Sequence, residues 1–290
     1  MPIDGPVPAW LFSASAALTL WSIMIHVGMA IEPGEFRWIR ANAGMLLKGL
    51  FAVLVAVPAL ALAVVRNLEL ARAVEIGIVL MSISPGAPVA LRRAIEAGGR
   101  RAYATSLQIA LAILAVLSMP FWIAALDRLY DGTAAIDPRE LFRQVFMAQL
   151  LPLGIGILLR RTAPRLSQWM LPRLAPFASV LLLMMTLLAL LTAWRSVVDA
   201  GPHVAAAIVA TSLLALCCGH LLGGPEPSTR TATAIACAAR NPGLALLVVA
   251  LNGASPVIVA TVLAYLVISA LTILPYVFWR RALARRQNST

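Results

Sequence analysis

The chain has 290 residues, of which 61% are hydrophobic and only 12% are charged. A soluble domain of this length is about half apolar and about a quarter charged, so the composition argues against a water-soluble fold. The formal net charge of +11 suits the cytoplasmic loops of a membrane protein better than a nucleic-acid surface, because Lys and Arg accumulate in such loops. Cys217, Cys218 and Cys237 all lie in apolar stretches and predict no disulfide framework.

Apolar runs recur along the whole chain, and each is long enough to cross a hydrocarbon core about 30 Å thick. They predict an all-α polytopic membrane protein with nine transmembrane helices. The predicted spans are Ala9–Ile31, Ala43–Val65, Ala73–Ala97, Ala102–Leu126, Gln144–Leu159, Leu174–Trp194, His203–Gly223, Thr229–Gly253 and Pro256–Trp279.

The loop charges predict the orientation of the chain. If the N-terminus is outside, fifteen arginines lie on the inner side and six on the outer side, while Lys48 and Arg240 lie within spans. This excess of positive charge on one side favours an outside N-terminus and a cytoplasmic C-terminus. The N-terminal sequence MPIDGPVPAW has no basic segment and does not resemble a cleaved signal peptide. We therefore expect a multi-pass protein of the cell (inner) membrane.

Two of the predicted spans contain helix-breaking residues at their centres. The third holds SISPGAPVALRR, with Pro85, Gly86 and Pro88, and the eighth holds ARNPGLA, residues 239–245. Proline removes a backbone donor, and glycine allows the non-helical angles that a break needs. Broken backbone at membrane depth is tolerated only where it is buried in protein or lines a wet cavity. Both spans are therefore predicted to be broken helices beside a cavity.

The broken spans run in opposite directions, and each is followed by one further span before its half of the chain ends. Residues 1–143, with spans one to four, and residues 144–290, with spans five to nine, are thus predicted to be two inverted repeats, the first one helix short. Paired interrupted helices in corresponding positions indicate the binding site of a transporter.

Two segments resemble the bile acid:sodium symporter family. The first is SPGAPVALRRAIEAGG followed by YATSLQIALAILAVLSMPFW, and the second is HLLGGPEPSTRTATAIACAARNPGLALLVVALN. The resemblance implies a panel domain and a core domain, with two broken helices crossing in the core beside a cavity. It also implies nine spans with an outside N-terminus, as in the vertebrate-type members.

The sequence departs from the family where sodium ligands are expected. The family's Ser-Asn pair after the first break matches Ala90 and Leu91, and its Thr-Ser pair on the next helix matches Gln108 and Ile109. Its Glu and Gln on the second crossing helix match Ala236 and Arg240, and an earlier Gln matches Val53, five residues before Pro58. Hard cations prefer oxygen ligands, and carboxylates most of all. We expect these replacements to remove sodium binding.

Arg240 near the middle of the bilayer is costly, by about 2.5–3.5 kcal/mol on insertion scales, and needs a partner. Two roles are open. In one, Arg240 bonds to carbonyls freed in the broken third helix and acts as a built-in cation. In the other, its guanidinium faces the cavity and binds an anionic substrate such as a carboxylate, helped by the N-terminus of a half-helix beginning near Gly243.

The predicted function is a secondary transporter that moves a small organic anion, a carboxylate or a bile-acid-like molecule, by alternating access and without the usual sodium coupling. The partners are the anion and the lipid bilayer; no cofactor, metal site, nucleic acid or catalytic residue is predicted. The alternatives are metalloid efflux through the cysteines and a non-transporting sensor or scaffold of the same fold. The predicted substrate-binding residues are Ser84, Pro85, Gly86, Thr105, Gln108, Arg240, Asn241 and Gly243.

Overall fold

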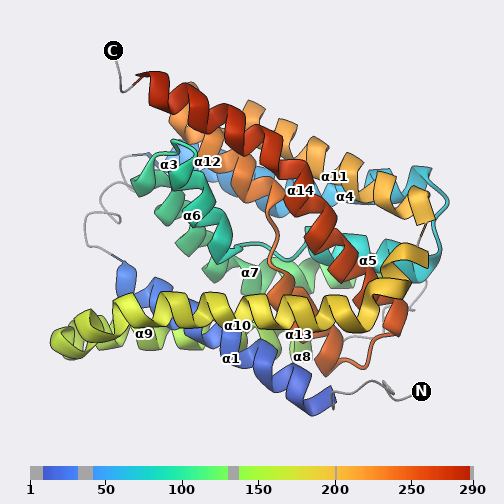
Figure 1. Ribbon diagram of the computed structural model, residues 1–290, viewed down its shortest axis with the longest axis horizontal. Helices are drawn as coiled ribbons and strands as arrows, with labels where there is room; N and C mark the ends of the chain where they lie inside the picture. Colours follow the sequence, from blue (N-terminus) through green and yellow to red (C-terminus); the bar gives the residue numbers. More distant parts are fainter. Residues whose placement is uncertain (1–8, 32–41, 130–136, 200, 288–290) are drawn as a thin grey trace.

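The computed structural model describes residues 9–31, 42–129, 137–199 and 201–287, and all regular elements within these ranges are helical (Figure 1). Residues 1–8 and the counted charges Arg37 and Arg40 lie outside the described residues. The elements are α1 (Ala9–Ala30), α3 (Ala43–Phe51), η1 (Ala52–Ala56), α4 (Val57–Asn67), α5 (Arg72–Ser82), α6 (Pro88–Glu96), α7 (Arg101–Leu129), α8 (Pro138–Val145), η2 (Phe146–Leu150), α9 (Leu151–Thr162), α10 (Pro164–Asp199), α11 (Gly201–Leu222), α12 (Pro227–Ala238), α13 (Pro242–Leu251) and α14 (Pro256–Gln287).

Six helical stretches in the described part of the chain are long and apolar enough to cross a membrane. They are Ala43–Asn67, Arg101–Leu129, Arg139–Thr162, Gly201–Leu222, Pro227–Leu251 and Pro256–Arg286. Lengths of 22 to 31 residues match or exceed the roughly 20 residues that span a bilayer. The helical architecture is that of a polytopic membrane protein.

Two non-helical segments, residues 83–87 and 239–241, each connect a pair of short helices. The first segment joins α5 to α6, and Gly86 within it has φ of +77°, a conformation that side chains with a Cβ rarely adopt. The second segment joins α12 to α13, with Ala239 and Asn241 in extended conformation. In both cases a proline begins the following helix, where its missing N–H costs no hydrogen bond.

Two helices contain a π-helical turn shortly before a proline, η1 before Pro58 and η2 before Pro152. In η1 the N–H of Val57 donates to the carbonyl of Ala52, whereas an α-helix would direct it to Val53. Residue 58 is proline and has no N–H to donate. The carbonyl of Val53 is therefore left without a donor from its own helix. The carbonyl of Leu54, whose α-helical donor would be Pro58, accepts from Trp122 Nε1 at 2.7 Å.

Helix α1 packs closely against α9 at a pair of glycines. A Cβ on Gly156 would overlap the carbonyl oxygen of Ile25, and a Cβ on Gly28 would overlap that of Leu153. Small residues at such a crossing let two membrane helices approach closely. Arg160 Nη1 also donates to the carbonyl of Met29 at 2.8 Å. Helices α1, α9 and α10 lie together along one side of the molecule (Figure 1).

We predict that Gly156→Ala lowers the apparent melting temperature of the purified protein, because its Cβ would force α1 away from α9. The expected destabilisation is about 1–3 kcal/mol, as for other overpacked interiors. Gly154→Ala is the matched control on the same helix, since its Cβ meets nothing within 4 Å. Equal melting temperatures for the two variants would contradict the close packing.

Candidate functional site

The two non-helical segments meet inside the protein. The backbone N–H of Asn241 donates to the carbonyl of Ser84 at 3.0 Å. On the first segment, Gln108 Nε2 of α7 donates to the carbonyl of Gly86 at 2.7 Å. Ser84, Gln108 and Asn241 are all buried. Backbone groups released by one interruption are therefore paired by the other interruption and by a neighbouring helix, as buried backbone polar groups require.

Arg240 is held at this meeting point by a carbonyl from a third element. Its side chain is 4% exposed, and Nη1 and Nη2 donate to the carbonyl of Val53 at 3.2 and 3.1 Å. This is the carbonyl that the π-helical turn and Pro58 leave without a donor. The guanidinium thus supplies the hydrogen bond that the distorted helix η1–α4 lacks, while its Nε has no partner among the described residues.

The acceptor differs from the one expected from the sequence. In one of the two roles left open for Arg240, it would bond to carbonyls of the broken third helix, but its acceptor lies on the preceding helix. The difference has a physical reason, because the free carbonyl of Ser84 is already taken by Asn241. The resemblance described above matches Val53 to a Gln that the family uses for sodium, so the guanidinium lies beside a position that the resemblance implies is a sodium-ligand position.

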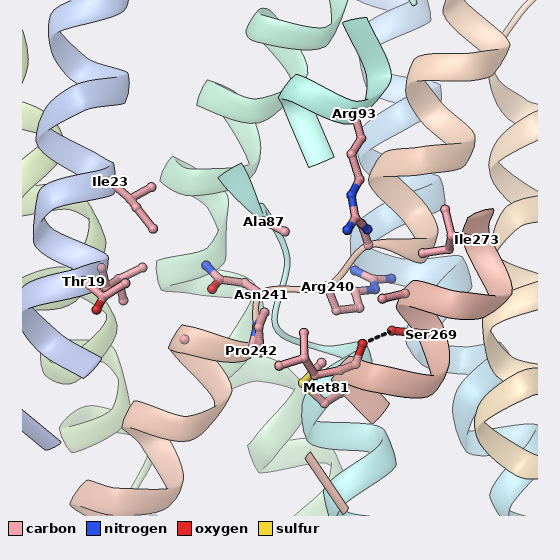
Figure 2. Close-up of a pocket in the computed structure, with 15 residues that line it drawn as sticks. Thr19, Ile23, Met81, Ala87, Arg93, Arg240, Asn241, Pro242, Ser269 and Ile273 are labelled. Carbon is pink, nitrogen blue, oxygen red and sulfur yellow. Dashed lines mark hydrogen bonds between the residues drawn. The ribbon is translucent and has the colours of Figure 1, made fainter. Parts of the chain in front are cut away.

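Asn241 connects the interruption to the helix that follows it. Its Oδ1 accepts from the N–H of Leu244 at 3.1 Å, the N-cap contact that begins α13. Its Nδ2 has no partner among the described residues, although Asn241 is only 3% exposed. Figure 2 shows the Asn241 side chain directed towards α1 and the Arg240 side chain leaving on the opposite side. Asn241 therefore offers a buried amide donor on the α1 side.

A cavity of about 150 Å³ lies beside this meeting point (Figure 2). Its walls come from α1, α5, α6 and α14 together with the second interruption. Two arginines, Arg93 and Arg240, are part of the lining, and no Asp or Glu is among the described lining residues. The cavity therefore combines positive charge and amide donors with apolar walls, which suits an anion with an apolar body.

The eight predicted substrate-binding residues occupy different places around the cavity. Arg240, Asn241 and Gly243 line it. Ser84, Pro85, Gly86 and Gln108 are buried in the supporting framework, and Ser84 Oγ donates to the carbonyl of Leu80 in the preceding helix α5. Thr105 is buried on α7 and does not line the cavity. Hence the predicted set divides into a lining group and a supporting group.

Arg93 is the lining residue that the sequence analysis did not select. It was counted with the charges on the inner side of the membrane, at the end of the predicted span Ala73–Ala97, and it lies within α6, which ends at Glu96. Figure 2 shows its side chain extending from α6 towards the interruption that holds Arg240. The available signal was its position, only five residues after the helix-starting Pro88.

The cysteines and His220 do not form a metal centre in the part of the chain that the structure describes, where no three His, Cys, Asp or Glu side chains gather. Cys217 is exposed and Cys237 is buried. His220 Nδ1 shares a 2.8 Å hydrogen bond with the hydroxyl of Tyr276 and packs edge-on against its ring. His220 therefore belongs to an aromatic cluster between α11 and α14.

Comparison with known proteins identifies the family. The model of the sodium bile acid symporter family matches residues 17–200 of this chain. The chain belongs to this family. No curated protein matches it. Sodium bile acid symporter family proteins are membrane transporters, and with its long apolar helices this chain is a multi-pass membrane transporter of that family.

The family match ends before the second interruption. It includes α5, α6 and the first interruption, but Arg240 and Asn241 lie beyond residue 200. Their link to the matched part is the hydrogen bonds to Val53 and Ser84. Membership of the family thus identifies the chain as a membrane transporter. The contacts of the second interruption are those of its own residues, which lie outside the matched region.

Proposed function

We propose that the protein is a secondary transporter that moves a small organic anion by alternating access across the cell (inner) membrane, without the usual sodium coupling. The observation that supports this most is the cavity beside the meeting interruptions, which has two arginines and no described acidic residue in its lining. A guanidinium is a strong partner for a carboxylate, and a cation would be repelled from such a cavity.

The proposal includes the architecture expected from the sequence. The nine spans would form two inverted repeats, residues 1–143 and 144–290, with the N-terminus outside and the C-terminus in the cytoplasm. Each half contains one interruption between short helices, at residues 83–87 and 239–241. Helices α1, α9 and α10 would belong to the panel domain and the remaining spans to the core domain, and the cavity would lie between them.

Sodium independence rests on the side chains that replace the sodium ligands of relatives. Ala90, Leu91 and Ala236 offer no side-chain oxygen, and hard cations need oxygen ligands. Gln108 is engaged with Gly86. Arg240 brings a fixed positive charge to the remaining position and bonds to Val53. The Arg240 guanidinium would therefore take the place of a bound sodium ion and would hold the two interruptions together in every step of the transport cycle.

Counterflow in proteoliposomes tests the transport proposal. Vesicles loaded with an unlabelled carboxylate should accumulate the labelled form transiently, and empty liposomes should not. The panel includes short monocarboxylates and a bile acid, because a carboxylate or a bile-acid-like anion was expected from the sequence. A purified protein that binds a carboxylate but gives no counterflow with any member of the panel would contradict transport and favour a sensor.

A further inference from the structure

We propose that Arg93 is the charge partner of the transported anion and that the cavity selects compact monocarboxylates. This inference rests on the proposed function and names the substrate class and the specificity-determining residue of the same site. It differs from the expectation for Arg240, whose guanidinium already has a protein partner.

The first observation is that Arg93 has a free charge. Among the described residues it makes no ion pair or hydrogen bond. The carboxylate nearest in sequence, Glu96, is engaged at both oxygens, since Oε1 accepts from Arg92 and Oε2 from Arg281. A partly buried guanidinium at a cavity wall without an acidic neighbour in the lining is therefore available for a ligand.

The second observation is that a residue of another element that also lines the cavity, Asn241, carries a buried and unpaired donor. Asn241 Nδ2 is without a partner among the described groups and points towards α1 (Figure 2). A buried donor that is left unpaired costs about 1–3 kcal/mol, and a carboxylate oxygen would satisfy it. Arg93 and Asn241 therefore both line the cavity in which we place the carboxylate.

The third observation is that Arg240 is not equally available. Both of its terminal nitrogens donate to Val53 on the helix behind the interruption. Its charge still adds to the positive potential at the cavity, but direct contact with an anion would require it to leave that carbonyl. The division of roles follows: Arg240 holds the framework together and Arg93 contacts the ligand.

The size and walls of the cavity limit the rest of the ligand. Its volume of about 150 Å³ is below the roughly 300–1,000 Å³ of pockets for drug-sized molecules, so a sterol does not fit. The walls around the polar end are aliphatic, with Leu20 and Ile23 from α1, Met81 from α5, and Leu266 and Ile273 from α14. A single carboxylate on a short, branched hydrocarbon body matches both limits.

The test compares 3-methylbutanoate with its neutral isostere 3-methylbutanamide, using binding to the detergent-purified protein by calorimetry. The wild type should bind the carboxylate at least about tenfold more tightly, the ratio expected for one hydrogen bond to a charged group. Arg93→Gln should abolish this preference, and Arg93→Lys should restore part of it. Arg92→Gln is the matched control, because Arg92 is exposed and paired with Glu96.

Two results would overturn the inference. One is an Arg93→Gln protein that melts like the wild type and still prefers the carboxylate; the other is a wild type that binds neither compound. Binding is measured without flux, so the two proposals can fail separately. If the wild type prefers the carboxylate and Arg93→Gln loses that preference, but the wild type gives no counterflow, only the transport proposal is contradicted. Counterflow of carboxylates that is unchanged in Arg93→Gln would contradict only the role of Arg93.

Discussion

Replacing Arg240 by Gln is expected to reduce carboxylate uptake at least tenfold and to lower the apparent melting temperature. The variant removes a charge that both terminal nitrogens anchor to Val53, whose carbonyl has no donor in its own helix. Leaving a buried carbonyl unpaired costs about 1–3 kcal/mol, and breaking this contact would loosen the second interruption from η1. Initial uptake rates in proteoliposomes and thermal unfolding measure the two effects.

Charge and hydrogen bonding at Arg240 can be separated by comparison with Lys. Arg240→Lys keeps the positive charge but not the planar pair of donors, so we expect uptake between that of the wild type and that of Arg240→Gln. The control is Arg173→Gln, which removes an exposed arginine that donates to Trp169 within its own helix. Normal uptake by Arg240→Gln would show that the buried guanidinium does not support transport.

Replacing Asn241 by Asp is expected to abolish uptake while leaving the melting temperature close to that of the wild type. The carboxylate would still cap α13, because an oxygen remains to accept from Leu244 and Asp is as good an N-cap as Asn. The same change converts the unpaired Nδ2 donor into a negatively charged oxygen at the cavity. An anionic substrate would then be repelled where it was previously bound.

The comparison with Asn241→Ala separates the cap from the donor. Alanine removes both functions, so we expect a loss of about 1 kcal/mol in stability from the missing cap together with reduced uptake. Thermal unfolding and counterflow of the same protein preparations give both values. Anion uptake by Asn241→Asp at the wild-type rate would contradict the placement of the substrate next to this amide.

The sequence was informative wherever the local residue types determine the backbone conformation. Pro85, Gly86, Pro242 and Gly243 indicated where helices would be interrupted. In the structure α5 ends at Ser82 and α6 begins at Pro88, while α12 ends at Ala238 and α13 begins at Pro242. The burial of Arg240 also followed from its position in an apolar run. The number of spans, their inverted symmetry and the orientation in the membrane remain predictions.

The partners across the fold could not be predicted from local patterns. Val53 lies 187 residues from Arg240, and its carbonyl is available only because of a π-helical turn that no sequence pattern used here indicates. Arg93 was counted only among the charges of the inner side, although the predicted span Ala73–Ala97 contains it, because no sequence pattern shows which way a side chain points from α6. The aliphatic walls of the cavity come from α1 and α14, which are distant in sequence and are brought together by tertiary packing.

The most direct test of the central claim is the sodium dependence of uptake by the wild-type protein. Initial rates of labelled carboxylate uptake would be measured in proteoliposomes with sodium or with N-methylglucamine at the same ionic strength. If the Arg240 guanidinium occupies the place of a bound cation, the two rates are equal over the whole range of sodium concentrations. A rate that rises steeply with sodium and vanishes without it would contradict the account.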